Sequence, residues 1–159
     1  LGMRPQNIGK SPIPATAGTA LEPPHSHLKG SLMLHFLHTR IRVGDLDRSI
    51  NWYCEHLGFE LKSRTDKSPA GNHVAHLELP GNPHTLELTW SPDFDLKVPA
   101  DLMHFAIGVP DLISFCDKLE NAGVEIWPDG WRSIFPEGNK MAFIDDPDGY
   151  EVERLERGE

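Results

Sequence analysis

Two histidines in this 159-residue chain are each followed by a glutamate at the same interval, and side chains of both types commonly bind metal ions. His38 precedes Glu87 by 49 residues, and His104 precedes Glu153 by the same 49 residues. Two imidazoles and two carboxylates suit a divalent metal such as Zn²⁺, Ni²⁺, Co²⁺, Mn²⁺ or Fe²⁺, whereas Ca²⁺ takes oxygen ligands. The second pair is the first shifted by 66 positions, so the four residues are predicted to form one metal site from two halves of a duplicated fold.

The duplication extends beyond the four candidate ligands. At the same shift, the residues that follow the first histidine correspond to those that follow the second: Ile41, Val43, Asp45 and Leu46 match Ile107, Val109, Asp111 and Leu112. We therefore expect one module over about residues 33–95 and a second over about residues 100–157.

The first module is predicted to contain one helix and four strands. Apolar residues alternate with His38 and two arginines up to Val43, which is the period of a half-buried strand. Asp45 or Asp47 can cap the helix that follows, and Gly58 is a typical left-handed stop after it. The three further strands are expected at 59–63, 73–79 and 85–90, the last two joined by a Pro-Gly-Asn-Pro turn.

The second module repeats this order. A strand over 103–109 leads to a helix that Asp111 caps and Gly123 ends, and strands are expected at 124–127, 141–145 and 150–155. The sequence therefore predicts an α+β fold of two tandem βαβββ modules, which form a cup-shaped curved sheet with the helices outside.

Strand periodicity gives the four candidate ligands a common direction. His38 and His104 lie on the polar faces of their strands, while Glu87 and Glu153 have apolar or long neighbours on either side. A carboxylate pointing into a sheet cavity is costly to desolvate unless it is paired or bound to a metal. All four side chains are therefore expected to point into the cup.

The other histidines are weaker candidates for metal ligands, because a single histidine on a strand more often has a structural role than a ligating one. His35 has no repeat mate and lies on the opposite face from His38. His76 shares a strand with Glu78, but the positions shifted by 66 are Ala142 and Ile144. The remaining histidines of the body are expected at the surface or in loops: His56, His73 and His84.

Composition and charge exclude several classes of protein. The net charge of −9 disfavours nucleic acid and anionic membranes as partners, and no apolar run is long enough for a membrane helix. Cys54 and Cys116 lack metal-binding spacing and are predicted to be reduced, as is usual in the cytoplasm.

Residues 1–32 are rich in proline and lack the apolar run of a signal peptide, so they are predicted to form a flexible arm. A metal role for His25 and His27 within this arm is disfavoured.

At these residues the chain resembles glyoxalase I, the lactoylglutathione lyase of the vicinal-oxygen-chelate superfamily. The resemblance spans roughly residues 33–156. The segments that carry it begin at His38 (HTRIRVGDLDRSI), Leu86 (LELT), Met103 (MHFAIGV) and Asp145 (DDPDGYEVE).

The resemblance implies that His38, Glu87, His104 and Glu153 are the four metal ligands of a carbon–sulfur lyase. The substrate would be the hemithioacetal of methylglyoxal and glutathione, isomerised through an enediolate to S-lactoylglutathione. Glu153 is our choice as the base, with Glu87 able to serve the opposite face of the substrate. A glutamate alone is too weak a base to remove this carbon-bound proton. A metal would stabilise the negative charge that develops on the enediolate and so make the proton transfer possible.

The resemblance also implies where glutathione binds. Arg42 matches an arginine that binds a glutathione carboxylate, and Lys140 could meet the glycyl carboxylate. Ser91 stands where the family usually has an asparagine that contacts glutathione, and Ala100 stands where a basic residue is frequent. Another thiol therefore stays open as the cosubstrate.

Histidine at the first ligand position, with short connecting loops, resembles the form of the family that Ni²⁺ or Co²⁺ activates, and Zn²⁺ is possible. The family is usually a homodimer with shared sites, which take His38 and Glu87 from one chain and His104 and Glu153 from the other.

Two kinds of alternative remain. The chain could be another metal enzyme of this fold, namely an epimerase, a dioxygenase or a thiol transferase. A dioxygenase commonly uses two histidines and one glutamate, so the fourth ligand at Glu87 argues against it. It could also be a metal-free drug-binding protein, although such a cup prefers apolar and aromatic walls.

Overall fold

The computed structural model describes residues 35–134 and 140–157, so the arm predicted over residues 1–32, with His25 and His27, lies outside the described residues. Residues His35–Glu159 form one compact unit. No helix in the described part of the chain is long and apolar enough to cross a membrane.

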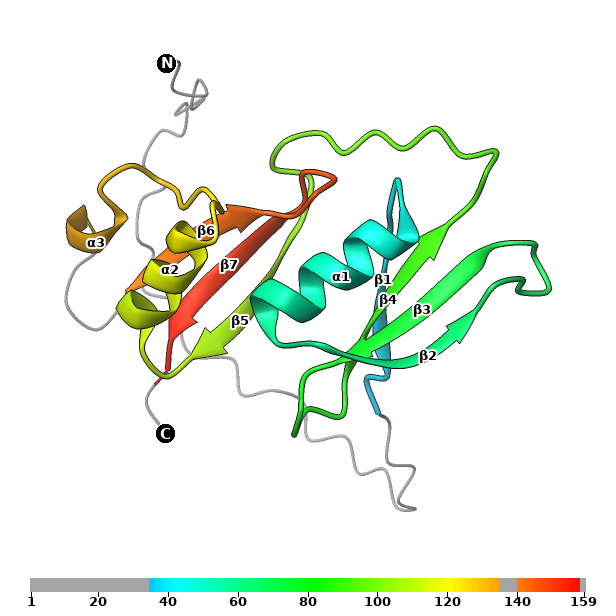
Figure 1. Cartoon of the computed structure of the whole chain (residues 1–159), viewed down its shortest axis with the longest axis horizontal. Helices are drawn as coiled ribbons and strands as arrows, with labels where there is room; N and C mark the ends of the chain where they lie inside the picture. Colours follow the sequence, from blue (N-terminus) through cyan, green and yellow to red (C-terminus); the bar gives the residue numbers. More distant parts are fainter. Residues whose placement is uncertain (1–34, 135–139, 158–159) are drawn as a thin grey trace, which may run out of the picture. The chain divides into compact units, whose positions relative to one another are not determined.

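The first module forms a four-stranded sheet with one helix (Figure 1). Its elements are β1 (His38–Arg42), α1 (Leu46–Leu57), β2 (Glu60–Thr65), β3 (His73–Glu78) and β4 (Thr85–Trp90). The strand order is β1-β4-β3-β2, with β1 parallel to β4 and the other pairs antiparallel. This places the first and the last strand of the module side by side.

The second module follows the same plan with a smaller sheet. Its elements are β5 (His104–Val109), α2 (Leu112–Asn121), α3 (Trp131–Ile134), β6 (Met141–Asp145) and β7 (Glu151–Glu156). The order is β5-β7-β6, with β5 parallel to β7. The structure differs from the prediction at residues 124–127, where only Trp127 pairs, in an isolated bridge to Phe143. Pro128 follows directly and has no N–H to extend a ladder.

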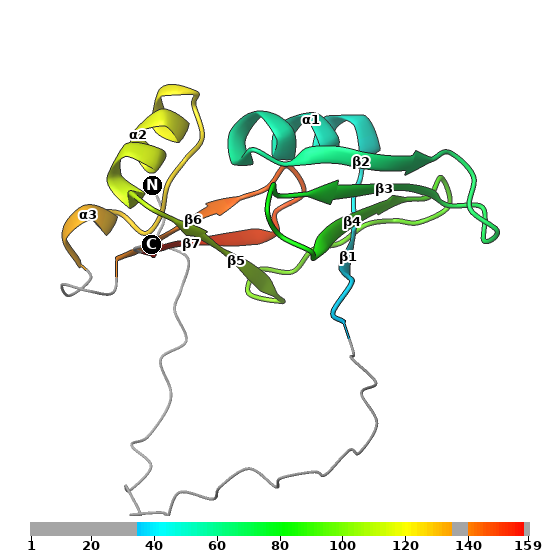
Figure 2. The same cartoon turned by 90° about the horizontal axis from the view of Figure 1, so that it is seen from below.

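Both helices begin as the sequence predicts. The Asp45 side chain accepts a hydrogen bond from the Arg48 N–H, and the Asp111 side chain accepts one from the Ser114 N–H. Gly58 ends α1 with a left-handed φ of 73°. Figure 2 shows α1 on one side of its four-stranded sheet, so the opposite face of that sheet is left for the candidate ligands.

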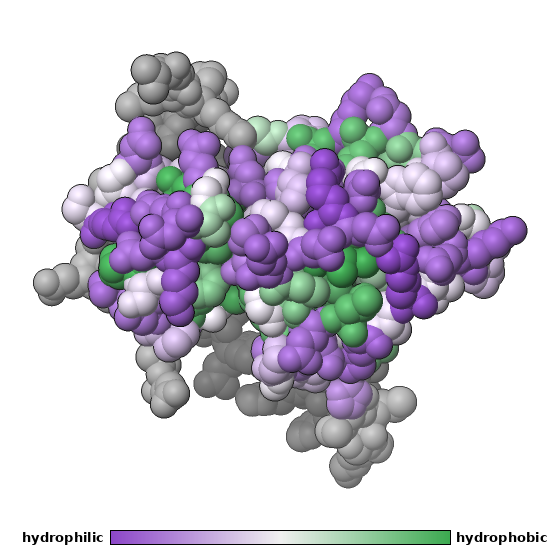
Figure 3. Space-filling view, in the orientation of Figure 1, coloured by the Kyte–Doolittle hydropathy of each residue, from purple (hydrophilic) through white to green (hydrophobic). Residues whose placement is uncertain are grey.

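The helices turn their polar sides outward, and Figure 3 shows mostly hydrophilic side chains on the face that carries α1 and α2. Beneath them lies one cluster of buried apolar residues that includes Tyr53 and Leu88 from the first module and Ile144 and Val152 from the second. The mixed α+β class with two small curved sheets is therefore confirmed.

The turn between β6 and β7 connects the modules. Tyr53 Oη in α1 donates a hydrogen bond of 2.9 Å to Asp146 Oδ2, and Gly44 N donates one of 3.1 Å to Asp148 Oδ2. A Cβ added at Gly44 would lie 2.8 Å from Asp148 Oδ1, so a larger residue there would force the Asp148 carboxylate to move. The acidic turn thereby holds the start of α1 against the second module.

Candidate metal centre

The first predicted pair lies on two adjacent strands. Arg40 of β1 pairs with Glu87 of β4 in the parallel ladder, so His38, two residues earlier, lies on the same sheet face as Glu87. His38 Nε2 is 3.5 Å from Glu87 Oε2. Strand periodicity thus predicted correctly that these two side chains share a face.

The second pair has the same geometry in the other sheet. Ala106 of β5 pairs with Glu153 of β7, again two residues after the histidine. His104 Nε2 is 3.6 Å from Glu153 Oε2. The repeat seen in the sequence therefore extends to strand register and to the distance between the two side chains.

Glu87 is a buried carboxylate held on both oxygens, with 4% of its surface exposed. Arg40 Nε donates to Oε1, and Thr89 Oγ1 donates to the same oxygen at 3.1 Å. Burial raises the pKa of this carboxyl, but the Arg40 and Thr89 hydrogen bonds and the nearby positive charges outweigh burial, and the pKa lies below its usual range. Glu87 is therefore ionised, with Oε2 turned toward the histidines.

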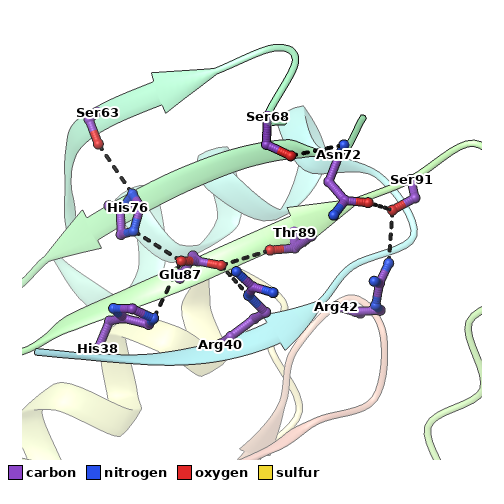
Figure 4. A network of polar contacts seen from close by, with 10 residues as sticks. All are labelled: His38, Arg40, Arg42, Ser63, Ser68, Asn72, His76, Glu87, Thr89 and Ser91. Carbon is purple, nitrogen blue, oxygen red and sulfur yellow. Dashed lines mark hydrogen bonds and ion pairs between the residues drawn. The ribbon is translucent and has the colours of Figure 1, made fainter. Parts of the chain in front are cut away.

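His76 is a neighbour of this pair that the sequence argument set aside. Its Nε2 lies 3.1 Å from Glu87 Oε2, because His76 of β3 pairs directly with Glu87 across the antiparallel ladder. Figure 4 shows His38, His76 and Arg40 converging on Glu87, with α1 behind the sheet. The contact could have been predicted from the hairpin register, because a turn at residues 80–83 sets His76 opposite Glu87.

The two pairs do not meet within the described chain. The donor atoms of His38, His76 and Glu87 all lie within 4.8 Å of one another, and neither His104 nor Glu153 belongs to this group. Neither of two cavities, of about 320 and 270 Å³, is lined by any of the four predicted ligands. The structure therefore presents two half-sites, one on each sheet.

The predicted substrate residues Arg42 and Ser91 lie together at the far ends of β1 and β4. Arg42 Nη1 donates a 2.8 Å hydrogen bond to Ser91 Oγ, and Ser91 Oγ donates one of 2.5 Å to Asn72 Oδ1. The Arg42 guanidinium also lies 4.1 Å above the Phe94 ring. Asn72, which the sequence argument did not single out, thus supplies an amide beside Ser91.

Lys140 is placed apart from these residues. Its Nζ donates a 3.0 Å hydrogen bond to Glu156 Oε1 near the end of β7, and the side chain is half exposed. The structure brings Lys140 into contact with none of the other predicted site residues that it describes. Its predicted role stays a prediction.

The donor chemistry fits a divalent metal in both half-sites. Donor atoms bound to one first-row metal ion at about 2.1 Å lie about 3 to 3.5 Å apart. The two histidine-to-glutamate separations, 3.5 and 3.6 Å, are close to the upper end of this range. Imidazole nitrogen with carboxylate oxygen suits Zn²⁺, Ni²⁺ or Co²⁺.

The chain is similar to several known proteins. The Glyoxalase/Bleomycin resistance protein/Dioxygenase superfamily matches residues 35–154. A probable lactoylglutathione lyase of Synechocystis sp. is 35% identical over 77% of this chain and 95% of its own length. The lactoylglutathione lyase of Haemophilus influenzae is 34% identical over 77% of this chain and 93% of its own.

Solved structures show the same relationship. A trypanothione-dependent glyoxalase I from Leishmania major matches with a TM-score of 0.65 and 34% identity, over 78% of this chain and 87% of that one. An antibiotic-binding protein from Streptomyces, TnmS3, has a TM-score of 0.64 at 19% identity, covering 81% of this chain and all of its own, and so shares the fold alone. The chain belongs to the glyoxalase/bleomycin resistance protein/dioxygenase superfamily and, within it, to the glyoxalase I family.

Proposed function

We propose that this protein is a metal-dependent glyoxalase I that isomerises the hemithioacetal of methylglyoxal and glutathione to S-lactoylglutathione. The observation that carries the proposal is the repeated pair: a histidine and a glutamate on adjacent parallel strands, in the same register, in both modules. The names of the relatives at 34 and 35% identity support the same reaction.

His38, Glu87, His104 and Glu153 would hold the divalent ion, which supplies positive charge where the enediolate develops. Ni²⁺ or Co²⁺ is our first choice and Zn²⁺ our second. Glu153 accepts the proton from the carbon that bears sulfur and returns it to the neighbouring carbon. Glu87 is held by Arg40 and Thr89, so it suits the role of a fixed ligand.

Arg42 and Ser91 would bind a carboxylate at the other end of the substrate. Arg42 lies four residues after His38 on β1, which at the rise of a strand is about 13 Å away. A substrate that spans both points must be extended, with one reacting end and one anionic end, as a glutathione adduct is. Ser91 stands where the family usually has an asparagine that contacts the substrate. The amide of Asn72, which lies beside Ser91, could supply those hydrogen bonds instead.

The protein is proposed to act as a homodimer. The His38–Glu87 pair of one chain would then face the His104–Glu153 pair of the other, which completes a four-ligand site that the described chain does not assemble alone. A cytoplasmic location is proposed as well, because both cysteines are free thiols, as expected in a reducing compartment.

Metal reconstitution tests this function. Metal-stripped protein would be refilled with Ni²⁺, Co²⁺, Zn²⁺ or Mn²⁺, and thioester formation from methylglyoxal would be followed by its ultraviolet absorbance. Parallel reactions with glutathione and with trypanothione separate the two thiols, since the Leishmania major relative is named for the second. Thioester formation with at least one metal and one thiol is expected, and its absence with every combination would refute the proposal.

A further inference from the structure

We propose that His76 is an additional metal ligand, so that the first module offers three donors, from His38, His76 and Glu87, to the divalent ion of the shared site. This inference rests on the proposed metal-dependent function and adds to it a donor outside the repeated pairs. Three observations support it. The donor atoms of His38, His76 and Glu87 converge, and a hydrogen bond orients His76. In the second module, Phe143 occupies the position equivalent to His76.

The three donor atoms have the spacing of a metal site. Glu87 Oε2 lies 3.5 Å from His38 Nε2 and 3.1 Å from His76 Nε2, and all three atoms lie within 4.8 Å of one another. The two separations from Glu87 Oε2 fit donors that share one ion with bonds of about 2.1 Å. Two imidazoles and one carboxylate are a sufficient protein ligand set for a divalent metal with open positions.

His76 is oriented by its other ring nitrogen. Nδ1 lies 3.2 Å from Ser63 Oγ on β2 and can donate its hydrogen to that hydroxyl, which leaves the Nε2 lone pair facing Glu87. A ligating histidine typically donates its second ring N–H in this way. The register of β2 shifts between Leu61 and Ser63, and this irregularity sets Ser63 opposite His76.

Glu87 is arranged to share one oxygen with a cation. Arg40 and Thr89 both donate to Oε1, whereas both histidines approach Oε2. Oε2 is therefore the oxygen that faces both imidazoles and that an ion between them would meet. Because the carboxylate is nearly fully buried and fixed from one side, the position of this oxygen is set before any ion binds.

Within the described part of the second module there is no such third donor. Phe143 of β6 pairs with Glu153 as His76 of β3 pairs with Glu87, and its ring lies edge-on to His104 at 6.2 Å. The rings of His38 and His76 are likewise edge-on, at 5.8 Å. The two half-sites thus have the same framework, but only the first carries a nitrogen at the third position.

The test uses the full-length chain with His104→Ala and Glu153→Ala, which removes both donors of the second module. Binding of Co²⁺ would be measured by calorimetry, and the paramagnetically shifted imidazole N–H signals would be counted by proton NMR. One Co²⁺ per chain and two shifted signals are expected. Adding His76→Ala should remove one signal and weaken binding by more than about 100-fold, beyond the usual cost of losing an orienting residue.

His73→Ala is the matched control, because His73 also lies on β3 but does not contact Glu87; it should change neither the affinity nor the signal count. In the unmutated chain three shifted signals are expected, and His76→Ala should leave two, which covers the case in which the doubly substituted chain does not fold. Two signals in the unmutated chain, or a count that His76→Ala leaves unchanged, would overturn the proposal. These readings need no substrate, so a failure here is separate from a failure to form thioester.

Discussion

Glu87 and Glu153 occupy the same register position in their sheets but have different surroundings. Arg40 lies opposite Glu87 and binds it, whereas Ala106 lies opposite Glu153 and offers no donor. Among the described residues, the polar partner of the Glu153 carboxylate is His104 alone. Glu87 is also the more buried side chain, with 5% exposed against 15% for Glu153. These surroundings support our proposal that Glu87 is the fixed ligand and Glu153 the base.

The first prediction concerns these two glutamates. Glu153→Gln should lower kcat by about 10²- to 10⁴-fold, the usual contribution of a general base, while much of the bound metal is retained. Glu87→Gln should lose metal and activity together. Metal content by elemental analysis and steady-state kinetics on the same samples would check this. Parallel loss of metal and turnover in Glu153→Gln would mean that Glu153 is only a ligand.

The second prediction concerns the carboxylate end of the substrate. Arg42→Ala removes the charged donor that Ser91 orients, so KM should rise about tenfold to hundredfold with little change in kcat. Arg64→Ala is the control, because Arg64 is bound to Asp47 and Asp66 at the surface. A fall in kcat without a change in KM would place Arg42 at the reacting end of the substrate instead.

The third prediction concerns the turn that joins the modules. Burial raises the pKa of Asp146 above its usual value, even though Tyr53 and two backbone N–H groups donate hydrogen bonds to it. The folded state therefore holds this proton more tightly than the unfolded state does. The resulting stability is complete below the unfolded pKa of about 3.8 and is lost as the pH rises through the raised folded value.

Asp146→Asn removes this titration while it keeps an oxygen for the same donors. Relative to the unmutated protein, the free energy of unfolding of the variant should increase as the pH rises through the folded pKa of Asp146. Above that pH the difference between the two proteins should stay constant. Denaturant titrations of both proteins at a series of pH values would measure it. A difference that is constant with pH would contradict the burial effect.

The fourth prediction concerns a buried arginine. Arg154 is fully buried, its Nε and Nη2 have no hydrogen-bond partner among the described residues, and burial lowers its pKa to about 10. Its Nη1 donates to the Glu153 carbonyl at 3.2 Å, and its guanidinium lies 5.6 Å from the Phe115 ring. Replacing a buried charge that is only partly compensated with an apolar side chain of similar length should raise stability by about 1 kcal/mol or more.

Arg154→Met should therefore unfold at a higher denaturant concentration than the unmutated protein. Arg154→Lys keeps the buried charge and should show no such gain. A loss of stability in Arg154→Met would show that the guanidinium is compensated by its surroundings.

Much of the fold could be predicted from local signals. The two aspartate caps, Gly58 and the alternating strands placed both main helices and all seven observed strands close to their observed bounds. The strand expected at 124–127 is reduced to a single bridge, because its pairing depends on a ladder that Pro128 does not extend. The helix α3 (Trp131–Ile134) was not predicted, since one turn carries too little periodicity.

The candidate site was predicted in part, for a different reason. The repeat fixed His38, Glu87, His104 and Glu153, because a duplicated sequence preserves positions along the chain. It missed His76, because the comparison at a shift of 66 set His76 against Ala142. Strand pairing instead makes Phe143 its equivalent, one residue further on. Contacts across a hairpin follow its register, which a fixed sequence shift does not capture.

The central claim is that the two His–Glu pairs, one from each of two chains, form one catalytic site, and subunit complementation tests it most directly. One chain would carry His38→Ala and Glu87→Ala, the other His104→Ala and Glu153→Ala, each with a different affinity tag. The heterodimer purified through both tags has one intact shared site. It should show about half the activity of the unmutated dimer, while each parent homodimer is inactive. A heterodimer as inactive as its parents would contradict the shared site.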